Sequence, residues 1–319
     1  RQAAEDLRQA GLPDRKVEAW KYTPVRRLEE MAPRLSLDAT DSAIDFPHPL
    51  REQAQTVRIA NGCLPAELPH MPSGVSLFDL GDGVVAHEQR VRPLFESMRT
   101  SGPDRAFTAL NMAAPPTGLL VHVAAGVDAG SLLLQWASDD PGQRLDQFRL
   151  VVLLDEGAQL ELLEQYESGV AMGQALNLVM HADLAQQAHF SHVRVQNQPA
   201  DAVFFTASAV QQAAHSRYRH SGFDLGGGLV RHEMDVLLGG ESAHAELGGA
   251  FVLDGARHVD NHVSIDHAAI DCSSEQFYRG VLGGRSRRVF NGRALIREGA
   301  DGSSVLQSNA NLLLSRGAE

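Results

Sequence analysis

The side chains best suited to bind a metal are concentrated in the last third of the sequence. If residues 257–267 form a strand, His258, Asp260 and His262 share one face, because side chains alternate along a strand. His267 then belongs to the opposite face. Imidazole and carboxylate groups, with the thiolate of nearby Cys272, are suitable ligands for zinc or ferrous iron. Their spacing matches no standard zinc pattern, so a polar, solvent-exposed strand face is the alternative interpretation.

Four aspartates recur at short intervals in the same region and indicate a second possible chemistry. Two carboxyl groups share the acid and base steps in enzymes that cleave polysaccharides. A β-helix carbohydrate-active enzyme is therefore the alternative function, and its candidate residues are Asp254, Asp260, Asp266 and Asp271. The simpler explanation is that acidic residues occupy turns and exposed strand positions in an acidic chain.

Several common catalytic and cofactor-binding motifs are absent from the sequence. Neither lysine, Lys16 or Lys21, follows a glycine, so no ATPase-type phosphate-binding loop is present. The H-E-x-x-H, G-x-S-x-G and C-x-x-C motifs are also missing. Residues 81–86 resemble a dinucleotide-binding turn, but no second βαβ unit follows them. Cys63, after an Asn-Gly pair, is more typical of a packed thiol than of a nucleophile.

The composition limits the classes of partner. The chain has 319 residues, and 40 acidic against 28 basic residues give a formal charge of −12. This charge opposes the attraction to phosphates on which non-specific nucleic-acid binding depends. The two cysteines suit a reducing compartment, and no apolar run is long enough to span a bilayer. We therefore expect a soluble, cytoplasmic protein that binds neither nucleic acid nor membranes.

Two kinds of structure must position these residues. Residues 1–117 have mixed character, which predicts an α/β N-terminal domain. Apolar residues at helical spacing predict helices at residues 3–10 and 91–98, followed by a helix with Asp104 as its N-cap. Short strands are predicted at residues 57–60 and 75–80.

After Gly118 the pattern changes to short apolar or alternating runs between turn residues. Strands are predicted at residues 119–123, 131–136, 148–154, 159–164, 175–180, 189–195 and 203–210. A sandwich and a solenoid share this spacing. The long stretch without helices and the scarcity of aromatic residues favour the solenoid. We therefore predict that residues 118–319 form a right-handed parallel β-helix.

Four segments of the sequence resemble the SufD family. The pattern R-x-x-E-x-W-K-Y-T, which contains Trp20 and ends at Thr23, is similar to the segment before the N-terminal domain of that family. V-F-N-G at residues 289–292 and Q-S-N-A-N-L-L-L-S at residues 307–315 resemble the last coils of the SufB/SufD core. Residues 260–280 also resemble this core. The resemblance covers essentially the whole chain, and the Trp20 segment favours SufD over its relative SufB.

This resemblance implies a non-catalytic scaffold subunit of the cytosolic SufB–SufC–SufD complex, on which iron–sulfur clusters are assembled and in which SufC is the ATPase. Family members pair with SufB through their C-terminal coils. The partner contacts implied here are Phe290, Asn291, Gly292, Gln307, Asn309 and Asn311. A homodimer is the possible assembly when the partner is missing.

The resemblance also bears on cofactors. It implies a transient iron–sulfur cluster at the subunit interface and no tightly bound cofactor in the isolated chain. The candidate sulfur or iron ligands are Cys272, His258, His262 and His267. Family members continue past the position of Glu319 with a C-x-H strand and helices that dock SufC. We therefore expect this sequence to lack the C-terminal helical domain, and its functional residues have no counterpart here.

Overall fold

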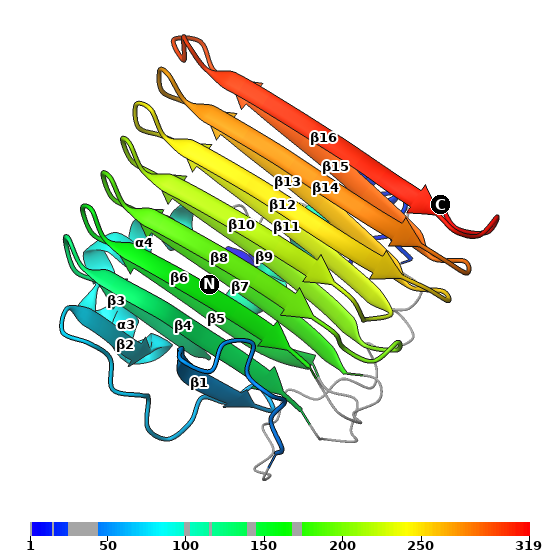
Figure 1. The fold of residues 1–319 in the computed structure, drawn as a ribbon, viewed down its shortest axis with the longest axis horizontal. Coiled ribbons are helices and arrows are strands. Elements are labelled where there is room, and N and C mark those ends of the chain that lie inside the picture. Colours follow the sequence, from blue (N-terminus) through cyan, green and yellow to red (C-terminus); the bar gives the residue numbers. More distant parts are fainter. Residues whose placement is uncertain are drawn as a thin grey trace.

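The computed structural model describes residues 2–14, 16–24, 44–98, 103–114, 117–138, 145–167 and 174–319. Two sheets of eight strands each stack coil upon coil into a parallel β-helix (Figure 1). All neighbouring strands are parallel except β2 and β3. The predicted fold class, mainly β with a parallel β-helix after a mixed α/β region, is confirmed.

From β3 onward, each sheet collects every second strand of the chain. Sheet 1 has the order β1 (Gln55–Ala60), β4 (Asp128–Ala137), β6 (Gln159–Tyr166), β8 (His189–Gln196), β10 (Arg217–Asp224), β12 (His244–Leu253), β14 (Ser273–Leu282), β16 (Ser304–Leu313). Sheet 2 has the order β15 (Arg287–Ile296), β13 (His258–His267), β11 (Leu229–Leu238), β9 (Val203–Gln212), β7 (Ala175–Leu184), β5 (Leu145–Leu154), β3 (Gly118–Val123), β2 (Val75–Asp79). We call the space between the two sheets the lumen.

Alternate residues of every strand point into the lumen and form the main hydrophobic core. Val259, Val263 and Ile265 of β13 belong to this core, as do Leu160 and Leu162 of β6. Parallel strands with both faces covered read as continuous apolar runs, which explains the sequence of β5. The outward residues of β5 are buried too, because helices cover sheet 2.

One turn conformation recurs in every coil, where a strand of sheet 2 connects to the next strand of sheet 1. A residue with positive φ recurs in these turns at intervals of 27–31 residues, and the last turn contains a second one, Gly299; the recurring residues are Gly126, Gly157, Gln187, His215, Ser242, Asp271 and Gly302. Because L-residues rarely adopt this conformation, the position normally favours glycine. Four of the seven are not glycine, which hides the repeat in the sequence.

The N-terminal part packs on the outer face of sheet 2 (Figure 1). Its elements are α1 (Gln2–Ala10), η1 (Glu18–Trp20), α3 (Leu80–Ala86), α4 (Glu88–Ser97), η3 (Pro103–Arg105) and α5 (Ala106–Ala113). Two local predictions are wrong. Gly81 and Gly83 lie inside α3 and not in a turn before it. Asp104 lies in η3, and Arg105 is the N-cap of α5, because a 3-10 turn precedes that helix.

Candidate functional site

The C-terminal end of the β-helix has unpaired edges. β15 and β16 are the terminal strands of sheets 2 and 1, and each has ten residues, a length of about 33 Å (Figure 1). We call residues 285–316 the open end. Ser304 and Leu314 donate their backbone N–H groups toward the β14 side. The N–H groups of odd-numbered residues in β16 therefore point away from β14, and such an edge can pair with another strand.

The open end also exposes apolar side chains that would be buried inside the stack. Val305 and Leu313 of β16 are in register with the inward Ser274 and Leu282 of β14, yet they are 38% and 51% exposed. Leu306 and Leu312 on the outer face are exposed as well. At the opposite end, the segment between β1 and β2 packs its apolar side chains Leu64, Leu68 and Met71 against the core. Only the C-terminal end of the described β-helix is therefore uncapped.

Arg288 organises the interior of the open end. Its side chain points into the lumen from β15 and donates to the side-chain oxygens of Asn309 and, at 2.8 Å, Asn311. The guanidinium carbon lies 4.4 Å from the centroid of the Phe251 ring and 5.4 Å from that of Phe290. Burial lowers the pKa of Arg288 to about 10. The two asparagines thus connect the side chains of the two edge strands.

The six predicted interface residues all lie at the open end. Phe290, Asn291 and Gly292 are in β15, and Gln307, Asn309 and Asn311 are in β16. Asn291 points outward, whereas the other five occupy inward positions of the terminal coil. Their role in binding a partner stays a prediction.

Cys272 and His267 lie in the interior of the preceding coil. The Cys272 thiol is fully buried and contacts the carbonyl oxygen of Gly240 at 3.3 Å. Burial raises the pKa of this thiol. Cys272 follows the positive-φ residue of its turn, a position that Ala243 and Ser216 occupy in neighbouring coils. His267 is also buried, and its Nε2 lies 2.9 Å from the Ser274 hydroxyl.

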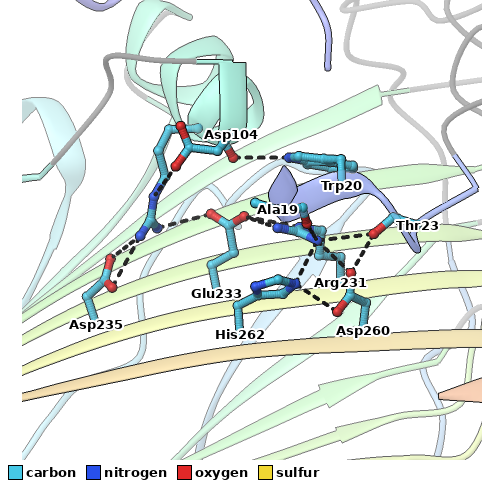
Figure 2. Close-up of polar contacts among 10 residues, drawn as sticks. Ala19, Trp20, Thr23, Asp104, Arg231, Glu233, Asp235, Asp260 and His262 are labelled. Atoms are coloured by element: carbon cyan, nitrogen blue, oxygen red, sulfur yellow. Dashed lines mark hydrogen bonds and ion pairs between the residues drawn. The ribbon is translucent and has the colours of Figure 1, made fainter. Parts of the chain in front are cut away.

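His258, Asp260 and His262 share the outer face of β13, as the alternation predicts. The face is not solvent-exposed, because the N-terminal segment covers it (Figure 2). Asp260 is 1% exposed and accepts a hydrogen bond of 2.5 Å from the hydroxyl of Thr23. Burial alone would raise the pKa of Asp260, but the contact with His262 and the charge of Arg231 lower it.

Arg231 of β11 is the centre of this contact (Figure 2). Its guanidinium binds Asp260 at 2.6 Å, donates to the carbonyl oxygen of Ala19 at 2.9 Å, and lies 4.1 Å from the centroid of the Trp20 ring. Trp20 is 1% exposed. We call Trp20, Thr23, Arg231 and Asp260 the N-terminal clamp. The clamp gives Trp20 and Thr23 of the W-K-Y-T pattern a structural role, whereas Lys21 and Tyr22 are exposed. Arg15, which begins that pattern, lies outside the described residues.

The four aspartates of the enzyme hypothesis are dispersed. Asp254 and Asp271 lie in the turns at opposite ends of β13, about 30 Å apart along the strand. Asp260 is bound by Arg231, and Asp266 forms an ion pair of 2.6 Å with Arg297. Paired acids in glycoside hydrolases are about 5–10 Å apart. The prediction of a catalytic aspartate cluster is therefore wrong.

Polar residues that the sequence analysis did not single out line the middle of the lumen. Glu164 is fully buried, and Arg194 binds it at 2.5 Å through Nε. His192 lies 3.4 Å from the same carboxylate and 3.1 Å from the hydroxyl of Tyr218. Burial would raise the pKa of Glu164, but Arg194 and His192 hold it at about 2.

The chain of contacts continues toward the open end. Arg194 donates to the Thr206 hydroxyl at 3.1 Å, Thr206 lies 2.8 Å from His232 Nδ1, and His232 Nε2 lies 3.0 Å from Asp224. We call Glu164, His192, Arg194, Thr206, Tyr218, Asp224 and His232 the lumen network. The alternation along β6 could have identified Glu164 as a lumen residue, because it occupies the next inward position after Leu160 and Leu162.

Two searches of the described residues give negative results. No three histidine, cysteine or acidic side chains among them converge as metal ligands would. The described helices include none that is long and apolar enough to cross a membrane. The candidate ligands agree with the first result, because His258 and His267 lie at opposite ends of β13 and Cys272 points inward.

The sequence of the β-helix matches a family model described as SUF system FeS cluster assembly, SufBD core domain, over residues 137–319. The chain is similar to an iron–sulfur cluster assembly SufBD family protein of Synechocystis, with 26% identity over 98% of this chain and 72% of that protein. It is 24% identical to the iron–sulfur cluster assembly protein SufD of Escherichia coli, over 100% of this chain and 74% of that protein. A SufBD family protein of Mycobacterium bovis is 31% identical over 41% of this chain and 35% of its own length.

Proposed function

This chain belongs to the SufBD family of iron–sulfur cluster assembly proteins, and we propose that it is a non-catalytic scaffold subunit that pairs through its open end with a SufB-like β-helix subunit. The observation that carries this proposal is the uncapped terminal coil. Within the described residues, both edge strands expose backbone groups and leucines, and such an edge can pair with a strand of another chain. A second β-helix can continue both sheets and bury these leucines.

The charge of the open end favours a different chain over a second copy as the partner. Residues 285–316 carry six arginines and only two acidic residues, Glu298 and Asp301, although the whole chain has a net charge of −12. In a symmetric dimer the same surface meets itself, so the arginines that are neither turned into the lumen like Arg288 nor paired with an acidic residue like Arg287 and Arg297 would face one another. A partner whose terminal coil is acidic avoids this repulsion. The homodimer is therefore the less favourable assembly.

The cluster is the cargo of such a complex. We assign its assembly to the junction between the two subunits, where both chains can contribute ligands, and we place the complex in the cytoplasm. Among the described residues, no group of side chains forms a complete ligand set on its own. Among the candidate ligands, His262 is partly exposed on β13, whereas Cys272 is enclosed in the preceding coil. ATP hydrolysis belongs in this proposal to a SufC-like partner, since the sequence has no phosphate-binding loop.

Pairing through the edge of β16 can be tested with a proline. Gln307→Pro removes a backbone N–H that points away from β14 and leaves the bonds between β14 and β16 intact. Gln307→Ala removes the same side chain but keeps the N–H group. Capture of a SufB-like subunit from the same organism should weaken about tenfold or more with the proline variant and stay near wild type with the alanine variant.

The folding of both variants is checked by circular dichroism before the capture experiment. Equal capture by Gln307→Pro and the wild type would show that this edge does not pair. Failure of the wild-type chain to capture the subunit would overturn the scaffold proposal itself.

A further inference from the structure

A groove on the outer side of sheet 2 has the size of a small-molecule site. It lies between the N-terminal helices and β5, and its volume is about 720 Å³. Ligand sites usually enclose about 300–1,000 Å³. Its walls are mostly apolar and include Val84, Val91, Phe95, Met98 and Met112. It lies far from the open end, on a different face of the molecule.

Arg149 lines the groove and is only 6% exposed. Its Nε donates to the Asn111 side-chain oxygen at 3.1 Å and its Nη2 to the Asn111 carbonyl at 2.5 Å. The guanidinium carbon lies 5.6 Å from the centroid of the Phe95 ring. All these partners are neutral, and within the described ranges no carboxylate forms an ion pair with Arg149.

Three other arginines that are buried or nearly buried have a carboxylate partner, whereas Arg288 at the open end, like Arg149, donates only to neutral groups. Arg105 binds Glu233, Arg194 binds Glu164, and Arg231 binds Asp260. A buried charge without a counter-charge is unfavourable unless an opposite charge reaches it. Arg149 therefore leaves an uncompensated positive charge beside an apolar groove.

His181 is a second buried titratable side chain beside Phe95. It is fully buried on the outer face of β7, and its ring centroid lies 4.9 Å from that of Phe95. Burial, and then the positive charge of Arg149, lower the pKa of His181 to about 3. His181 is thus neutral at physiological pH, and it neither adds to nor offsets the charge of Arg149.

We propose that the groove binds an organic monocarboxylate with an apolar body, whose carboxylate contacts Arg149 while the body lies along Phe95 and Met112. The apolar walls exclude a small hydrated anion as the preferred ligand. The rim carries two carboxylates, Glu88 and Glu96, and one arginine, Arg92. These acids disfavour ligands with several negative charges. The site is independent of partner binding at the open end.

The test uses decanoate as the probe and ¹³C-methyl methionine NMR as the readout. Decanoate should shift the signals of Met98 and Met112, which line the groove, and leave those of Met180 and Met234 in the lumen unchanged. Acetate, which lacks the apolar body, and decanol, which lacks the charge, should each bind at least about tenfold more weakly. No shift, or equal shifts of all four methionines, would overturn the proposal.

Two matched variants distinguish the effect of the Arg149 charge from that of the Arg92 charge on the rim. Arg149→Met should reduce decanoate affinity about tenfold or more, whereas Arg92→Met removes an exposed positive charge from the rim and should change it less than about threefold. If Arg149→Met does not fold, the wild-type methionine shifts and the comparison of decanoate with decanol still decide the question. Equal affinities for decanoate and decanol would contradict the role of Arg149.

Discussion

Replacing Arg194 by methionine tests whether the lumen network holds the middle coils together. The substitution keeps much of the side-chain volume but leaves the Glu164 carboxylate fully buried without its arginine partner, with His192 at 3.4 Å. It also removes the hydrogen bond of 3.1 Å to Thr206. Breaking a buried ion pair on one side costs about 3–5 kcal/mol, so we expect the free energy of unfolding to fall by that amount.

The assay is urea unfolding at pH 7, followed by circular dichroism. The double variant Glu164→Leu, Arg194→Met is the control, because replacing both charges with apolar groups removes the desolvation penalty. It should be clearly more stable than Arg194→Met alone. A loss below about 1 kcal/mol for the single variant, or additive losses from Glu164→Leu and Arg194→Met, would refute the reasoning.

Three further predictions concern pH, the clamp and the thiols. The folded-state pKa of Glu164 is about 2, below its ordinary value of 4.5. The contribution of ionised Glu164 to folding stability should therefore be complete above about pH 4.5 and be lost toward pH 2. Across this range, the urea midpoint of the Glu164→Leu, Arg194→Met variant should fall less than that of the wild type. Trp20→Ala should cost about 3–5 kcal/mol and speed amide exchange of residues 16–24, whereas alanine at the half-exposed Tyr22 should have little effect. Iodoacetamide should label Cys63 in the folded protein but Cys272 only after unfolding, as read by mass spectrometry; rapid labelling of Cys272 would contradict its burial.

The order of elements could be read from the sequence because turns and apolar runs are local signals. The coil repeat could not, since Gln187, His215, Ser242 and Asp271 replace glycine at the positive-φ position and interrupt the pattern. Several strands are longer than predicted. In sheet 2 the ends are hard to locate in the sequence, because outward residues are also apolar where helices cover them. Strand alternation is then absent, as in β5.

The sequence correctly predicted which site residues share a face of a strand, but not which other residues cover that face. The parity of β13 correctly placed His258, Asp260 and His262 on one face, because alternation is a property of the strand itself. What covers that face comes from residues more than 200 positions away, and only the folded chain brings Thr23 to Asp260. Arg149 could not be singled out either, because its contacts Asn111 and Phe95 lie in helices that only the fold brings to β5.

The recurring turn also makes the coil a natural unit of change in length. Inserting a single residue into one strand would move its inward side chains to the outside and set the polar groups of the lumen against apolar neighbours. Inserting or deleting a complete coil of 27–31 residues would preserve the register of every strand. Relatives with a longer or shorter β-helix should therefore differ from this protein in steps of one coil. Smaller differences in length should be confined to the loops that connect a strand of sheet 1 to the next strand of sheet 2.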